Sequence, residues 1–446
     1  MLDFFLNIIE TPAIVLGLVA MLGLILQRKN FGQVFSGTLK TALGMLVLSA
    51  GSTLISTEIG PFVDLFSSVF HLSGFATSSE AVVGAMQTAV PLIASTSSLI
   101  MAIGFLVNII LARISPLKYI FLTGHMMWIL SIVLAFSLYT ANFSETMIIV
   151  VGSILQGVIM VTLPAIAQPM VRKITGGDTI AIGHLTTLGT VTSAYIGGLL
   201  GDKSKSTEDM KLPESLEFFK DTSVSVSIVI GFFYLLVVII AGPEAVSEYA
   251  GDTNYIVYGV LKALGFTSGI LILLQGVRMF LGELVPAFKG ISDKLVPGAI
   301  PALDVPALFG FAPNALMVGF VSAVVGMLLG MVVSSFAFGA VPLVSIIGAF
   351  FTGGVAGIMG NATGGRRGAV IAGVIYGFLL IVGSAFLFGL FDFAAYGVSG
   401  VGHDCIDVMV ILTALKQPVV GIILILAVFV AMSFYQLKKA KKTAGE

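Results

Sequence analysis

Long apolar stretches, separated by short polar or basic segments, run along almost the whole chain. A helix needs about 20 mostly apolar residues to cross a bilayer, and the pattern predicts about eleven spans, several of them shorter or more polar than that. They lie at roughly 12–27, 40–57, 94–112, 120–140, 146–169, 222–242, 257–283, 296–312, 314–336, 368–391 and 417–436. The pattern therefore predicts an all-α polytopic membrane protein, with residues 1–436 forming one membrane-embedded domain.

The composition agrees with this class. Hydrophobic residues make up 57% of the chain and charged residues 10%, and the mean hydropathy is +1.08, whereas a soluble domain carries about 25% charged residues. No long run of like charge indicates a nucleic-acid partner, and no Cys/His spacing indicates a zinc site. We therefore predict neither nucleic-acid binding nor a metal or other cofactor.

The basic residues favour one orientation in the membrane. With eleven spans, most of them fall on one side: Arg28, Lys29, Arg113, Lys118, Arg172, Lys173, Lys289, Lys294, Arg366, Arg367, Lys438, Lys439, Lys441 and Lys442. The opposite loop at 243–253 has no basic residue, and Lys262 and Lys416 are the exceptions. Because cytoplasmic loops carry the excess of Lys and Arg, we predict an external N-terminus and a cytoplasmic basic tail at 437–446.

Two apolar segments, 174–201 and 342–365, are unusually rich in Gly, Thr and Ser. Irregular backbone at membrane depth is tolerated only where protein buries it or where it lines a wet cavity. Both segments begin and end on the predicted cytoplasmic side, so we interpret them as re-entrant hairpins. The alternative is a poorly formed span, which would disturb the distribution of basic residues.

Several ionisable residues fall within or beside apolar stretches. They are Lys40, Glu80, Glu283, Asp304 and Asp404. Because such a group costs several kcal/mol in lipid and normally faces an internal aqueous path, the pattern is typical of a transporter. A structural alternative applies to Glu80, which could pair with Lys40 or Arg278 inside the protein.

Two histidines and an aspartate are the best candidates for chemistry. His125 opens a predicted span in Leu-Thr-Gly-His, His184 lies in the first predicted hairpin, and Asp304 follows a proline-rich segment. A single histidine near a helix start is more often a structural hydrogen-bonding group. Together, at breaks in the spans, these side chains could hydrogen-bond several hydroxyls of a polar solute.

Five long strings carry a family resemblance. They are KTALGMLVLSAGS (40–52), PLKYIFLTGHMM (116–127), AIGH (181–184), STEDMKLPESLEFFKD (206–221) and LLQGVRMFLGELVPAFKGISDKLVPGAIPALDVPALFGFAPNA (273–315). Through them the chain resembles the L-ascorbate family of enzyme IIC (EIIC), the permease subunit of the bacterial phosphotransferase system (PTS), from about residue 10 to 436.

The resemblance implies a homodimer in the bacterial cell (inner) membrane, built from a V-motif part and a mobile core that moves like an elevator. The core elements would lie around 40–130, 174–201, 296–315 and 342–365. A separate enzyme IIB (EIIB), supplied with phosphate by enzyme IIA (EIIA), would phosphorylate the solute from a phosphocysteine. EIIC itself would then hold no catalytic residue, and Cys405 would carry no phosphate.

The resemblance also implies a substrate site. Gly51, His125, His184 and Asp304 match the ascorbate-binding pattern of the family. Ile129 and Leu185 stand where that pattern has glutamines, and Ser79-Glu80 replaces a Thr-Tyr pair. We therefore expect a site containing Gly51, Ser79, Glu80, His125, His184, Leu185 and Asp304, with L-ascorbate or a related neutral sugar or polyol as its substrate.

Two other functions stay open on the sequence alone. An ion-coupled secondary transporter would use Glu80, Asp304 and the two histidines as proton- or sodium-coupling groups. A membrane receptor could use the same fold.

Overall fold

The structure is a computed structural model that describes residues 11–69, 83, 86, 90–210, 222–338, 342, 344–345, 348–391 and 405–444. Among these residues, eight helices are long and apolar enough to cross a membrane: Phe31–Phe66, Pro91–Ile114, Glu145–Thr175, Ile230–Ala250, Tyr255–Leu273, Pro313–Ala337, Ala349–Leu390 and Pro418–Ala440. Three shorter apolar helices accompany them: Leu16–Leu26, Gly124–Thr140 and Ile406–Leu415. The chain is a multi-pass membrane protein, and the count of eleven spans stays a prediction.

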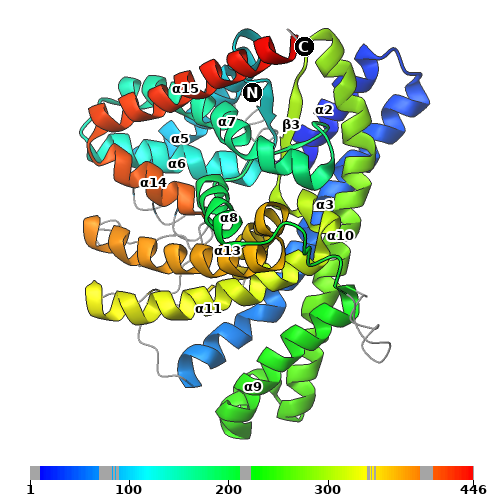
Figure 1. Cartoon of the computed structure of the whole chain (residues 1–446), viewed down its shortest axis with the longest axis vertical. Helices are drawn as coiled ribbons and strands as arrows, with labels where there is room; N and C mark the ends of the chain where they lie inside the picture. Colours follow the sequence, from blue (N-terminus) through cyan, green and yellow to red (C-terminus); the bar gives the residue numbers. More distant parts are fainter. Residues whose placement is uncertain are drawn as a thin grey trace.

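The helices form two groups (Figure 1). The first, here called the long-helix group, contains α2 (Pro12–Leu26), α3 (Phe31–Val69), α9 (Thr222–Ala250) and α10 (Tyr255–Lys294), which pack on one another. Two ion pairs join α3 to α10. Lys40 Nζ lies 3.0 Å from Glu283 Oε1, and Lys262 Nζ lies 2.9 Å from Glu58 Oε2.

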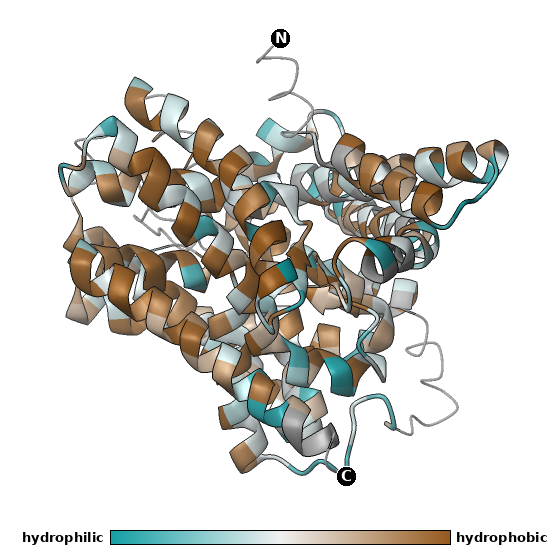
Figure 2. Cartoon of the chain, turned by 90° about the horizontal axis from the view of Figure 1, so that it is seen from above, coloured by the Kyte–Doolittle hydropathy of each residue, from teal (hydrophilic) through white to brown (hydrophobic). Residues whose placement is uncertain are grey.

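The second group contains the strands and is here called the strand-bearing group. Its helices are α5 (Pro91–Ile114), α6 (Gly124–Thr140), α7 (Glu145–Thr175), α8 (Thr187–Leu200), α11 (Pro313–Ala337), α13 (Gly354–Leu390), α14 (Ile406–Leu415) and α15 (Pro418–Ala444), with the π-helical turn η3 (Ala349–Gly353) before α13. Hydrophobic residues make up much of the outer helices (Figure 2), as expected of a surface that faces lipid. On α15, for example, Val419 is 66% and Ile423 60% exposed.

Phenylalanines line the junction between the two groups. Phe233 of α9 packs on Phe320 of α11, with ring centroids 6.5 Å apart. Phe266 of α10 packs edge-on against Phe350 of η3, at 5.8 Å. These contacts are apolar, so no hydrogen bond between these rings would have to break if one group moved past the other.

A three-stranded parallel sheet lies inside the strand-bearing group. Its order is β1 (Tyr119–Phe121), β3 (Ile300–Leu303) and β2 (Ala181–Ile182), with Tyr119 opposite Ile300 and Ala181 opposite Ala302. The chain is mostly helical, as predicted, but an all-α class omits these strands.

The predicted span at 296–312 is wrong. This segment forms β3 and a 3₁₀ helix, η2 (Val305–Phe311), instead of a transmembrane α-helix. Pro297, Pro301 and Pro306 explain the difference. Proline lacks the N–H that an α-helix needs, and it disfavours the α conformation in the residue before it.

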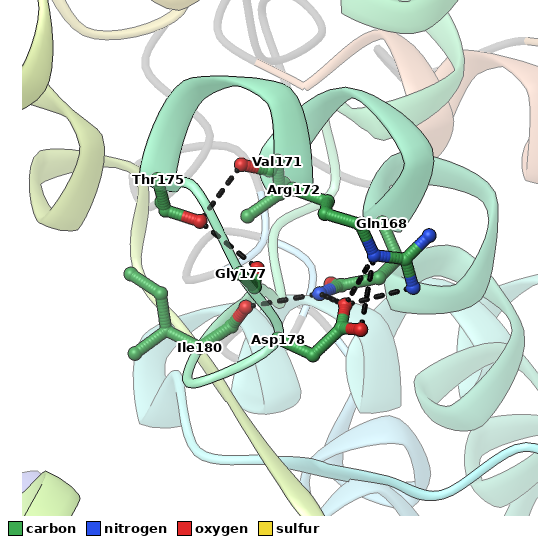
Figure 3. Close-up of polar contacts among 7 residues, drawn as sticks. All are labelled: Gln168, Val171, Arg172, Thr175, Gly177, Asp178 and Ile180. Carbon is green, nitrogen blue, oxygen red and sulfur yellow. Dashed lines mark hydrogen bonds and ion pairs between the residues drawn. The ribbon is translucent and has the colours of Figure 1, made fainter.

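Buried side-chain amides complete the two free edges of the sheet. Asn108 of α5 donates from Nδ2 to the Tyr119 carbonyl (3.1 Å) and accepts at Oδ1 from the Phe121 N–H (3.0 Å). Gln168 of α7 donates from Nε2 to the Ile180 carbonyl (3.2 Å), beside β2 (Figure 3). An open sheet edge at membrane depth would be costly, and these amides act in place of a neighbouring strand.

The two segments predicted as re-entrant hairpins have different structures. Residues 174–201 contain β2 followed by α8. Part of 342–365 lies outside the described residues; the rest contains η3 and the start of α13. Non-helical backbone at Gly364 and Gly365 interrupts α13 just before the predicted span at 368–391. The boundary at these glycines agrees with the sequence, and the re-entrant path stays a prediction.

Candidate functional site

His125, His184 and Asp304 meet at the carboxyl ends of the three parallel strands. His125 follows β1 and lies in the first turn of α6, His184 follows β2, and Asp304 directly follows β3. His125 Nε2 lies 3.8 Å from Asp304 Oδ2, and His184 Nε2 lies 3.8 Å from Asp304 Oδ1. The sheet therefore brings together three residues that are far apart in sequence, as parallel strands do when their ends share an edge.

The three side chains differ in their access to solvent. The exposed fraction is 5% for the His184 side chain, 17% for Asp304 and 35% for His125. The histidine rings are 6.2 Å apart and meet at 70°. Both His–Asp separations are too long for a direct hydrogen bond, and one solute hydroxyl lying beside such a pair could hydrogen-bond to both groups.

Local hydrogen bonds orient Asp304. Its Oδ1 accepts from the Val305 N–H (2.7 Å), so the carboxylate caps η2. The neighbouring backbone is held by sheet bonds: the Leu122 N–H donates to the Ala302 carbonyl (2.9 Å), and the Gly183 N–H donates to the Leu303 carbonyl (2.8 Å). The positions of both histidines relative to Asp304 are thus determined by backbone contacts with β3.

A polar cluster also holds the entry to β2, at the end of α7 (Figure 3). Asp178 accepts from Arg172 Nε at 2.9 Å and from Gln168 Nε2 at 2.8 Å. Partial burial alone would raise the pKa of Asp178, but the hydrogen bonds and charge of Arg172 and the bond from Gln168 bring this pKa below its ordinary value. The cluster fixes the chain before it enters the sheet.

The other predicted site residues have different positions. Gly51 lies in α3, where an added Cβ would come within 2.4 Å of the Leu273 N and 2.7 Å of the Gly269 O of α10. The glycine therefore permits close helix packing in the long-helix group, and its role in substrate binding stays a prediction. Leu185 follows His184 and is fully buried, as is Ile129 in α6. Ser79 and Glu80 lie outside the described residues.

The ionisable residues predicted at membrane depth are in part paired. Lys40 forms its ion pair with Glu283, and Glu58 and Lys262 form a pair that the sequence reasoning missed. Asp404 lies outside the described residues. The sequence reasoning also missed Asn108, Gln168 and Asp407, although a polar residue inside an apolar stretch is itself the signal that could have found them.

Metal ligation is a geometric option for the same three residues. The candidate ligand atoms of His125, His184 and Asp304 lie within 4.8 Å of one another. Zinc–ligand distances of about 2.0–2.2 Å place tetrahedral ligands about 3.3–3.5 Å apart, so the side chains would have to move closer to hold this ion. The prediction of no metal stays a prediction.

Comparisons with known proteins identify the family. The family model for EIIC-GAT, described as the PTS system sugar-specific permease component, matches residues 7–404. The chain is also similar to a Mycoplasma pneumoniae protein named ascorbate-specific PTS system EIIC component, with 30% identity over 436 aligned positions that cover 84% of this chain. The alignment covers 64% of that relative's length. The chain therefore belongs to the EIIC-GAT family of PTS sugar-specific permease components.

Proposed function

We propose that this protein is the EIIC permease subunit of a phosphotransferase system and that it translocates L-ascorbate or a related sugar or polyol. The cluster of His125, His184 and Asp304 carries the proposal. Each of the two imidazoles lies 3.8 Å from the one carboxylate at the strand ends. Together the three groups offer both donors and acceptors to a solute with several hydroxyls.

The surroundings of His125 favour a solute with a negative charge. His125 lies in the first turn of α6, and no side chain caps this helix end. Helix N-termini stabilise anions, and ascorbate is an anion at neutral pH. Asp304 would accept hydrogen bonds from the hydroxyls of the solute, away from the ionised oxygen.

Two buried positions argue for testing neutral solutes as well. Ile129 and Leu185 are fully buried and apolar, so they supply none of the side-chain hydrogen bonds that glutamines would give. Losing such partners from a polar site costs discrimination between solutes. A neutral sugar or polyol is therefore the second substrate class within the same proposal.

In the proposed transport cycle, two copies of the chain form a dimer and the strand-bearing group moves against the long-helix group. The phenylalanine contacts of Phe233 and Phe266 would form the moving junction. At the cytoplasmic face a solute hydroxyl would attack the phosphocysteine of EIIB, and the S–P bond would break as the O–P bond forms. The phosphorylated product, with its added negative charge, would bind less well beside Asp304.

The test is uptake of labelled L-ascorbate into cells that lack their own ascorbate transport and express this chain with or without separate EIIA and EIIB proteins. Accumulation of a phosphorylated product only with the partners would support the proposal. Accumulation of unmodified solute that collapses with the proton or sodium gradient would support ion-coupled transport instead. Phosphorylation of galactitol or another neutral sugar or polyol, but not of ascorbate, would keep the mechanism and reject ascorbate in favour of the second substrate class.

A further inference from the structure

Asp407 is a fully buried carboxylate beside the loop that carries His184. It lies in the first turn of α14 and is 0% exposed. Burying a carboxyl group is costly unless it is hydrogen-bonded, and a packing role alone does not require a polar, ionisable residue here. Its contacts therefore indicate what it does.

One side-chain and one backbone hydrogen bond join Asp407 to residues just after His184. The Asp407 Oδ1 accepts from the Leu188 N–H (2.8 Å), and the Asp407 N–H donates to the Leu185 carbonyl (3.0 Å). The carboxylate thus caps the N-terminus of α8 from another helix, since α8 has no side-chain cap from its own chain neighbour Thr186. The pair of bonds fixes both ends of the segment 185–188.

Further contacts connect this segment to His184 itself. The Thr187 hydroxyl donates to the His184 carbonyl (2.9 Å), and the Thr186 hydroxyl is hydrogen-bonded to the Tyr376 hydroxyl. On the other side of His184, the Gly183 N–H is bonded to the Leu303 carbonyl (2.8 Å), next to Asp304. The backbone of His184 is held from β3 on one side and from α14 on the other.

We propose that Asp407 is a positioning residue of the substrate site, which holds the His184 imidazole toward Asp304 through the segment 185–188. This inference rests on the proposed function, because the site it positions is the proposed substrate site. If the α14 carboxylate is lost, α8 loses its cap, the segment 185–188 relaxes, and His184 no longer keeps its place 3.8 Å from Asp304.

The structure supplies a matched control. Glu208 also caps a helix from a distance, because its Oε1 accepts from the Ala315 N–H (2.9 Å) at the start of α11. Glu208 follows α8 in sequence, beyond Gly201, whereas Asp407 acts at the beginning of α8. Glu208→Ala therefore removes a helix cap of the same kind without touching the segment after His184.

The experiment measures histidine reactivity with diethyl pyrocarbonate by mass spectrometry, on purified full-length protein. In the wild type, His184 is shielded (side chain 5% exposed) and His125 is accessible (35%). We expect Asp407→Ala to raise the labelling of His184 about tenfold, roughly the effect of losing about 1.4 kcal/mol of local order. Glu208→Ala should leave His184 shielded. Unchanged His184 labelling in Asp407→Ala would overturn the proposal.

Two further variants keep the test decisive if Asp407→Ala fails to fold. Asp407→Asn retains an oxygen that can accept from Leu188 and should restore most of the shielding. Thr187→Val removes only the hydroxyl bonded to the His184 carbonyl and should raise the labelling of His184 by a smaller factor. Equal labelling in Thr187→Val and the wild type would likewise count against positioning through this segment.

A binding measurement links this positioning to function. Asp407→Ala should weaken L-ascorbate binding, and a double mutant with His184→Gln should lose little more than His184→Gln alone, because residues that act through one another are not additive. Additive losses would mean that Asp407 affects binding independently of His184. If the wild type binds no ascorbate, the proposed substrate fails, whereas the labelling result still decides the role of Asp407.

Discussion

The ion pairs of the long-helix group and the His–Asp cluster at the strand ends of the strand-bearing group differ in how their ionisable side chains are spaced. In the long-helix group, Lys40–Glu283 and Lys262–Glu58 are direct ion pairs at 3.0 and 2.9 Å. At the strand ends, by contrast, Asp304 lies 3.8 Å from each histidine. Pairs in direct contact satisfy one another and join helices, whereas ionisable groups held 3.8 Å apart are placed to hydrogen-bond a ligand together. We expect loss of a carboxylate to impair uptake strongly at the strand ends and only slightly in the long-helix group.

Asp304→Asn gives the largest expected effect. The change keeps the shape of the side chain but replaces one of its two acceptor oxygens by a donating NH2 group and removes the negative charge, so we expect uptake to fall about 100-fold with normal membrane expression. Uptake of labelled solute, corrected for the amount of protein in the membrane, measures it. Uptake equal to the wild type would remove Asp304 from the site.

Glu283→Gln is the matched control in the long-helix group. Its partner Lys40 is 56% exposed at the side chain, and such a pair contributes at most about 1 kcal/mol. We expect near-normal uptake. A loss as large as that of Asp304→Asn would contradict the proposed functional difference between the Lys40–Glu283 ion pair and the Asp304 cluster.

Asn108→Leu should give the largest loss of stability. Leucine is similar in size, but it leaves the Tyr119 carbonyl and the Phe121 N–H of β1 without the amide bonds, at a cost of about 2–4 kcal/mol. Thermal unfolding of the purified protein measures this. Asn254→Leu removes an amide that caps an exposed end of α10 and should cost only about 1 kcal/mol; equal losses would contradict the role of Asn108 at the sheet edge.

The contrast also explains what the sequence could and could not predict. Helices such as α5 and α11 follow from long apolar stretches, and the histidines and Asp304 were found because polar groups in such stretches are informative. The strands were missed because two to four residues form no readable alternation. Asn108 of α5 and Gln168 of α7 stabilise these short strands because their amides hydrogen-bond to the two outer edges of the sheet. Asp407 also lies in an apolar stretch, but its role depends on its hydrogen bond to α8, which is far away in sequence.

A double mutant that combines Ile129→Gln with Leu185→Gln tests the substrate assignment. Both side chains are fully buried, and both residues are close in sequence to the site histidines. The family resemblance places glutamines at these two positions. If the amides reach the solute, ascorbate affinity should rise about tenfold, the effect of one or two well-placed hydrogen bonds. Equilibrium binding of labelled ascorbate measures it, with Ile132→Gln, one turn further along α6, as the control. A folded double mutant with unchanged affinity would argue against this mapping of the pocket.

Asp178 gives the smallest expected effect, and it concerns stability alone. The pKa of Asp178 is lowered in the folded protein, so its ionised form stabilises the fold at neutral pH and this contribution is lost as the pH falls through the folded pKa. Because the side chain is 44% exposed, solvent screening limits the contribution to less than about 1 kcal/mol. Asp178→Asn should therefore lower the unfolding temperature by a few degrees at about pH 7 and by less at about pH 2.5, which is below the ordinary carboxyl pKa. A difference that stayed constant across this range would mean that the hydrogen bonds to Gln168 and Arg172, and not the charge, hold the chain at the entry to β2.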